Sequence, residues 1–348
     1  MMRSALVRKL ATVSLVFIFL VILAGSVVRA TGSGMGCPDW PKCFGYYIPP
    51  TDITELQFKP NHNYKKGIVI IVEEELQVAK KEFTSGTERN IDNWEPYTAH
   101  DYAIFNPLHT WVEYINRLIG ALSGIPILIF TIMSIWLWKD KKRFLLLSIF
   151  TVFAMAFQAW LGKTVVDSNL APFKITIHMV MALVIVAVIL YLIYNSKSSY
   201  KHQKFDLKFR NLLALATILT LIQVVLGTQV RQFVDVQNKL FGYFNWDITA
   251  VAPINFYIHR TLSILVLALN MWLFLRNRSL NLGYKKFNLV IGCIGLEIAT
   301  GIAMYYFNFP FSSQPLHLVI AAILIGIQFY IILESHNTYR LKNKIANT

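Results

Sequence analysis

Eight stretches of the chain are apolar almost without interruption, and shorter polar segments separate them. A helix of roughly 20 apolar residues crosses a bilayer core that is about 30 Å thick. The pattern therefore predicts an all-α, polytopic membrane protein with eight spans: Leu10–Val28, Trp111–Trp138, Phe144–Leu161, Ile175–Tyr194, Leu212–Val230, Phe256–Leu275, Phe287–Tyr306 and Leu316–Leu333. The first stretch also resembles a signal peptide, because basic residues precede it. Its apolar run exceeds the roughly 7–15 residues of a signal-peptide core, which favours a retained helix.

The composition supports this reading and excludes other classes. Hydrophobic residues make up 55% of the 348 residues and charged residues only 15%, against about 25% charged residues in soluble proteins. An ordinary soluble enzyme and a disordered protein are therefore excluded. Three cysteines are too few for a disulfide framework.

The positions of the basic residues along the chain explain its net charge of +14. Of the 33 Lys and Arg, 19 gather at residues 3–9, 139–143, 197–210, 276–286 and 340–344, all on one side of the predicted spans. Basic loops mark the cytoplasmic side, so we expect both termini in the cytoplasm. We expect the spans to be surrounded by membrane lipid. Because the orientation in the membrane explains the excess of basic residues, no nucleic-acid partner is needed. No long Arg- and Ser-rich transit segment precedes the first span, which favours a bacterial inner membrane.

A long outer segment, about residues 31–108, connects the first two spans. It is rich in acids, including Glu73, Glu74 and Glu75, and its apolar run Ile68–Val72 is too short to cross a membrane. We expect a folded or partly ordered cap.

The first four spans resemble the last four. Gly25-Ser-Val-Val-Arg29 matches Gly227-Thr-Gln-Val-Arg231, and similar pairs open the second and sixth spans and the fourth and eighth. Residues 1–200 and 201–348 are therefore predicted to form two tandem, pseudo-symmetric four-helix bundles. Four spans in each unit make the two units parallel, related by an axis along the membrane normal.

Three histidines lie near the outer ends of their spans, at matching places in this duplication: His178, His259 and His317, with Asn116 at the fourth place. Ionisable groups inside a membrane are costly and mark functional sites. Because neutral imidazole is an axial ligand of haem iron, we expect His259 and His317 to hold one haem. Arg260 could reach a propionate of that haem, and Arg117 holds the matching place. The alternative for each histidine is a hydrogen bond between helices.

His109, Glu113 and Asn116 share one face of the second span. His109 is either an interfacial capping residue or a substitute ligand. For Glu113 the sequence leaves two readings open: a salt bridge to Arg117 four residues on, or a catalytic carboxylate. Glu297 in the seventh span is expected to be structural or to pair with a polar neighbour.

Cys37 and Cys43 follow the first span on the outer side. That compartment is oxidising, which favours a disulfide, with free thiols or a metal site as alternatives. Cys293 in the seventh span is expected to be a packing residue.

The stretch Gly25–Cys43, with its outer cysteine pair, resembles the signature of the haem A synthase family, membrane enzymes that oxidise haem O to haem A for cytochrome oxidase. The resemblance covers nearly the whole chain except Thr51–Ala103, which looks like an insertion. It implies a b-type haem (haem b) between His259 and His317 in residues 201–348. It also implies a pocket for substrate haem O in residues 1–200, where His178 and Glu113 act on the substrate.

One position departs from the family. Its second-helix motif Glu-x-x-His-Arg reads Glu113-Tyr-Ile-Asn116-Arg117 here, so the expected histidine is absent. Either His178 alone binds the substrate iron, or His109 moves in. An open position on the iron suits oxygen activation.

The expected activity is oxidation of the C8 methyl group of haem O to a formyl group by successive hydroxylations. A dihaem b-type electron carrier that oxidises no haem is the main alternative, and a transporter is another. Haem O could be delivered by a haem O synthase. The sequence leaves the electron donor and the oligomeric state, including a homo-oligomer, open.

Overall fold

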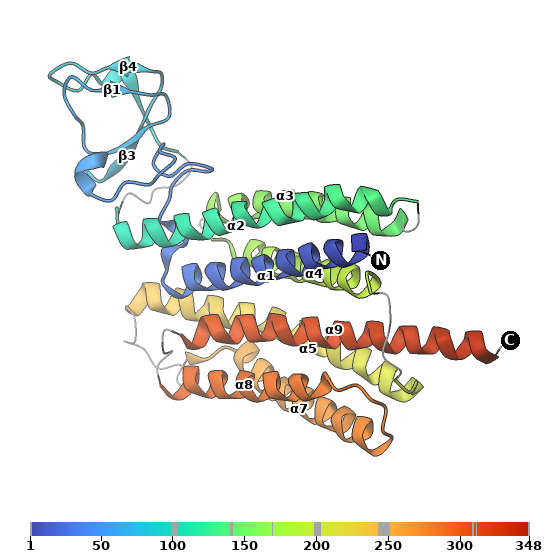
Figure 1. The fold of residues 1–348 in the computed structure, drawn as a ribbon. Helices are drawn as coiled ribbons and strands as arrows, with labels where there is room; N and C mark the ends of the chain where they lie inside the picture. The colour runs from blue at the N-terminus through green and yellow to red at the C-terminus, as the bar shows by residue number, and fades with distance from the viewer. Residues whose placement is uncertain are drawn as a thin grey trace.

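The computed structural model describes residues 2–98, 104–139, 142–168, 170–197, 203–242, 251–307, 310 and 312–346. Within them, eight helices are long and apolar enough to cross a membrane, as the sequence predicts. They are α1 Met2–Ala30, α2 Pro107–Ser134, α3 Lys142–Val166, α4 Pro172–Asn195, α5 Leu207–Phe241, α7 Ile254–Ser279, α8 Phe287–Tyr306 and α9 Ser313–Ala346 (Figure 1). Parts of two basic clusters, residues 140–141 and 198–202, lie outside the described residues.

Local sequence signals set several helix starts. Asn106 caps α2 by accepting a hydrogen bond from the His109 N–H, and Pro107 occupies the first turn, where no N–H donor is needed. Asp206 caps α5 in the same way, through the Phe209 N–H at 2.6 Å. Pro172 begins α4.

The helices form two groups of four. In the first group α2 packs on α1 and α3, and α4 packs on the same two helices, so α2 and α4 stand at opposite corners. In the second group α7 and α9 stand at opposite corners, each packed on α5 and α8. The groups meet where α9 contacts α1 and α4 and where α4 contacts α5 (Figure 1). In each group, two opposite helices therefore face each other across the interior of the bundle.

The outward faces of these helices are apolar. Phe153 is 69% exposed, Ile264 66% and Ile132 63%, each within a predicted span. Such surfaces are unstable in water and suit the hydrocarbon of a bilayer. The chain is thus a multi-pass membrane protein.

The outer segment contains two small antiparallel sheets, and Figure 1 shows them projecting from the helices. Strands β1 Asn63–Tyr64 and β4 Phe83–Thr84 form one sheet; β2 Val69–Val72, β3 Glu75–Ala79 and β5 Trp94–Pro96 form the other, in the order β2-β3-β5. Short 3-10 turns lie at Ser33–Met35, Ile53–Leu56, Ile91–Asn93 and Ile135–Leu137. The apolar run Ile68–Val72 is thus mainly a strand, and the cap is folded.

Candidate functional site

The four residues at matching places of the duplication, where the sequence predicts haem ligands, lie on the opposite corners of the two bundles. These ligand places are Asn116 on α2, His178 on α4, His259 on α7 and His317 on α9. Each of these side chains lies beside a glycine of a neighbouring helix. A Cβ atom would lie 3.7 Å from Asn116 Oδ1 if added at Gly25 and 3.4 Å from His178 Cε1 if added at Gly162. At Gly227 and Gly301 the distances to Cε1 of His259 and His317 would be 3.3 and 3.8 Å. Glycine therefore gives each side chain room against an adjacent helix.

His259 and His317 face each other inside the second bundle. Their ring centroids are 6.4 Å apart, and the ring planes make an angle of 66°. A metal–imidazole bond is about 2 Å long, so two imidazoles on opposite sides of one metal have centroids about 6 Å apart. The pair therefore fits bis-histidine ligation of one iron. Among the described residues, no cluster of three or more metal-ligating side chains occurs, and an axial haem pair needs only two.

The two rings differ in what they contact. His317 Nδ1 lies 3.0 Å from Glu297 Oε2 and 2.9 Å from Thr300 Oγ1. The buried Nδ1 of His259 has no hydrogen-bond partner among the described residues, although its backbone carbonyl accepts a hydrogen bond from Gln223 Nε2 at 2.6 Å. Arg260 is exposed, and its guanidinium lies over the Tyr257 ring at 5.4 Å.

His178 has similar surroundings in the first bundle. Its carbonyl accepts a hydrogen bond from Gln158 Nε2 at 3.0 Å, and its buried Nδ1 has no partner in the described part of the chain. A buried polar nitrogen without a partner costs free energy, so His178 has a hydrogen-bonding or ligand-binding capacity that the described residues do not use. His109 lies in the first turn of α2, two turns before Asn116.

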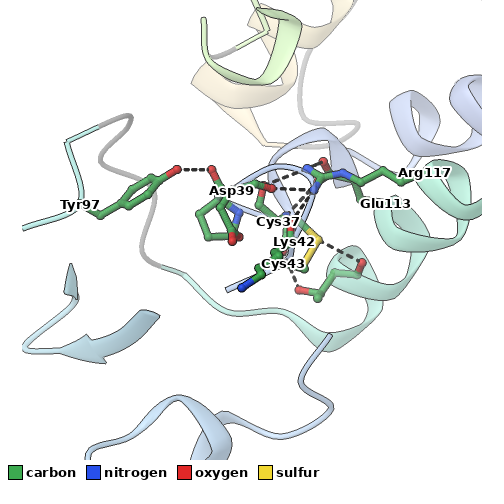
Figure 2. A network of polar contacts seen from close by, with 10 residues as sticks. Cys37, Asp39, Lys42, Cys43, Tyr97, Glu113 and Arg117 are labelled. Atoms are coloured by element: carbon green, nitrogen blue, oxygen red, sulfur yellow. Dashed lines mark hydrogen bonds and ion pairs between the residues drawn. A yellow bond between two sulfur atoms is a disulfide. The ribbon is translucent and has the colours of Figure 1, made fainter. Parts of the chain in front are cut away.

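Glu113 is buried, with 3% of its surface exposed, beneath the cysteine loop (Figure 2). Its Oε2 accepts a hydrogen bond of 2.9 Å from the Cys37 N–H, and its Oε1 pairs with Arg117 at 2.5 Å. The salt bridge that the sequence left as one reading is therefore present, and the loop amide is a second partner.

Arg117 connects α2 to the loop that Cys37 and Cys43 close with a disulfide. Its amino groups donate to the carbonyls of Asp39 at 2.6 Å, Lys42 at 2.9 Å and Cys37 at 3.3 Å (Figure 2). These donors favour a role for Arg117 in holding the loop rather than at a propionate. The disulfide confirms the pairing favoured by the sequence.

Close contacts on both sides fix this loop. A Cβ atom at Gly36 would lie 2.5 Å from the His109 carbonyl carbon, so only glycine fits against the start of α2. Tyr97 donates its hydroxyl to the Pro38 carbonyl at 2.7 Å, and burial is the main cause that raises the pKa of Tyr97 to about 12. Burial also raises the pKa of Asp39, against the opposing hydrogen bond from the Gly45 N–H. Tyr97 thus stays a neutral donor at physiological pH.

The sequence contains a signal for several contacts that its analysis missed. Gln158, Gln223 and Glu297 each stand four residues before a glycine that faces a ligand-place histidine, in Gln-x-x-x-Gly or Glu-x-x-x-Gly. The sequence matches Arg29 with Arg231 but does not reveal their partner, Asp235. Arg29 of α1 binds Asp235 of α5 at 3.3 Å and so joins the two bundles, and Arg231 binds the same carboxylate at 2.6 Å from within α5.

Comparisons with known proteins show which family the chain resembles. The model of the COX15-CtaA family, described as cytochrome oxidase assembly protein, matches residues 8–85 and 99–329. The match continues to residue 85, so the likeness extends further into the outer segment than the sequence signature predicts, and Thr51–Ala103 is not wholly an insertion. The haem A synthase of Ehrlichia canis is 24% identical over 341 residues, covering 90% of this chain and 89% of that protein.

Two further relatives carry the same name. The haem A synthase of Rickettsia prowazekii is 21% identical over 357 residues, covering 94% of this chain and 97% of that protein. The haem A synthase of Shewanella oneidensis is 28% identical over 221 residues; here the alignment covers 63% of this chain and 54%, about half, of that protein.

Proposed function

The chain belongs to the COX15-CtaA family of cytochrome oxidase assembly proteins, and we propose that it acts as a haem A synthase. In this reaction the C8 methyl group of haem O is hydroxylated, the alcohol is oxidised again, and the resulting hydrate loses water to leave the formyl group of haem A. The family match carries this proposal, because it runs through the spans of both bundles. The alignments with haem A synthases from Ehrlichia canis and Rickettsia prowazekii, at low identity, support it over nearly the full chain.

The second bundle is the proposed site of a resident b-type haem. His259 and His317 would hold its iron, which the 6.4 Å separation of their rings supports. Arg260, exposed and directly after His259, is the proposed partner of a propionate. A haem bound there supplies one-electron transfer for the reaction in the first bundle.

The first bundle is the proposed site of the substrate, between α2 and α4. His178 binds the iron of haem O, in line with its buried and unpartnered Nδ1 in the described residues. Asn116 on α2 stands at the place where the family motif has a histidine, and an amide is a poor ligand for iron. His109 is the candidate second ligand.

Glu113 is the proposed catalytic carboxylate. The ion pair with Arg117 and the hydrogen bond from the Cys37 N–H offset part of the cost of burying a charge at Glu113. As a carboxylate it would stabilise positive charge that develops at the C8 methyl carbon and accept the protons released there. Arg117 positions Glu113 and holds the disulfide loop over it. The proposed setting is a bacterial inner membrane with both termini in the cytoplasm, and haem O arrives from a haem O synthase.

The test is a haem extraction from the purified protein, co-expressed with a supply of haem O and analysed by chromatography. We expect haem A and haem b in the wild-type protein. His178→Ala and Glu113→Gln should retain haem b and lose haem A. Haem b with unchanged haem O in the wild-type protein would instead identify a dihaem electron carrier, and unchanged haem A in either variant would remove that residue from the chemistry.

A further inference from the structure

On α3, α5 and α8, one glycine lies beside a histidine of the proposed haem sites. Four residues before that glycine, each of these helices has a long polar side chain. On α3 and α5 this residue is a glutamine, and its amide donates to the backbone carbonyl of His178 or His259. On α8 the corresponding residue is Glu297, which has a carboxyl group in place of the amide and so has no N–H to donate. Glu297 contacts the imidazole of His317 instead of the backbone.

The contacts at His317 determine which ring nitrogen carries the proton. The Thr300 hydroxyl lies 2.9 Å from the Leu296 carbonyl and donates to it, which leaves the hydroxyl oxygen as an acceptor toward His317 Nδ1, also at 2.9 Å. Glu297 Oε2 is a second acceptor, 3.0 Å from the same nitrogen. An imidazole that binds iron through the Nε2 lone pair carries its proton on Nδ1, and both oxygens lie where they can accept that N–H.

The other two histidines lack such partners. The buried Nδ1 atoms of His178 and His259 have no hydrogen-bond partner in the described residues. Only one of the two rings facing each other in the second bundle is therefore polarised by an acid. A carboxylate that accepts the second N–H of a ligating imidazole orients the ring and makes it a stronger electron donor.

We propose that Glu297 and Thr300 are positioning residues that fix His317 as the Nδ1–H tautomer and lower the reduction potential of the haem held by His259 and His317. The inference rests on the proposed haem site of the second bundle. The negative charge of Glu297 near the iron stabilises the ferric form over the ferrous form. Hydrogen bonding and nearby charge are recognised controls of haem potential.

The experiment is a redox titration of haem b in the purified full-length protein, followed in the visible spectrum, with haem content measured beside it. Glu297→Gln should retain haem b and raise the midpoint potential, with a change of tenfold or more in the oxidised-to-reduced ratio, which is about 59 mV for one electron. Thr300→Val should shift it less, in the same direction. Gln223→Leu is the matched control, because Gln223 contacts the backbone of His259 and not its ring.

Each outcome decides the inference. An unchanged midpoint potential in haem-loaded Glu297→Gln and Thr300→Val would overturn it. An equal shift in Gln223→Leu would also overturn it, because the loss of any polar side chain near the haem would then change the potential. If Glu297→Gln retains no haem, Thr300→Val alone decides, and no upward shift there counts against the inference. A wild-type protein without haem b would instead refute the haem site of the proposed function.

Discussion

Glu113 Oε2 accepts a hydrogen bond from the backbone N–H of Cys37, so a carboxylate in a membrane helix supports the outer disulfide loop directly. The same carboxyl group binds Arg117, whose amino groups reach three carbonyls of that loop. The proposed acid and the loop above it therefore form one polar unit. A substitution at Glu113 should therefore affect the loop, and a change in the loop should affect Glu113.

Removing the guanidinium should destabilise this unit strongly. Arg117→Ala leaves the buried Glu113 carboxylate without a cation and takes the donor from three carbonyls. Loss of one partner of a buried ion pair costs about 3–5 kcal/mol. We expect a loss of this size in the free energy of unfolding, measured by denaturant titration in detergent.

The control for this variant is Lys163→Ala. Lys163 also pairs with an acid four residues on, Asp167, but both side chains are about 40% exposed. An exposed pair contributes about 0–1 kcal/mol, so this variant should be nearly neutral. Equal losses in the two variants would show that the Arg117 contacts add nothing to an ordinary helix pair.

A second prediction concerns the space beside the proposed haem-ligating histidines. In Gly227→Val the new Cβ would lie 3.3 Å from His259 Cε1, and the branched methyl groups would come closer and displace the ring. We expect haem b per protein, measured as the pyridine haemochrome, to fall several-fold. Gly292→Val on α8 is the control, because no atom lies within 4 Å of its added Cβ. A parallel fall in both variants would indicate general helix damage.

The eight spans could be predicted because the apolar length of a helix is a local property. The pairing of His259 with His317 followed from the duplication, since equivalent residues of equivalent helices reach similar depths. The outer strands could not be predicted in the same way. They are two to five residues long, and the turn that joins β2 to β3 is made by Glu73 and Glu74 with φ of 53° and 64°, where glycine or asparagine is usual.

The role of Arg117 was hidden for a different reason. The carbonyls that it binds precede it by 75 to 80 residues, and the sequence pattern contains no information on a backbone acceptor so distant. Glu297 is the opposite case. Its register with Gly301 was present in the sequence, but the partner ring becomes evident only when α8 packs on α9.

The membrane orientation gives a third prediction. If the basic clusters face the cytoplasm, a cysteine introduced at the exposed Glu88 of the outer segment should react with a membrane-impermeant thiol reagent in intact cells. A cysteine at the exposed Lys285, between α7 and α8, should react only after permeabilisation. The unmodified chain gives the background from Cys293. The reverse pattern of labelling would show that the protein has the opposite orientation in the membrane.

A fourth prediction concerns acid stability at the opposite end of the helices. Asp206 caps α5 and binds Arg276 through two hydrogen bonds of 2.9 Å, and these hydrogen bonds from Arg276 are the main cause that lowers the pKa of Asp206 below 3.8. A carboxyl group with a lowered pKa in the folded state stabilises the fold above pH 3.8, and this contribution is lost as the pH falls through the folded-state value.

Asp206→Asn retains a helix cap but removes the charge. Its free energy of unfolding at pH 7 should therefore be lower than that of the wild-type protein by about 1 kcal/mol, as for an ion pair near the surface. This difference should shrink below pH 3.8. Asp92→Asn, at an exposed site in the outer segment, is the control for a general charge effect. A difference between Asp206→Asn and the wild-type protein that persists undiminished in acid would mean that cap geometry, and not the charge on Asp206, provides the stability.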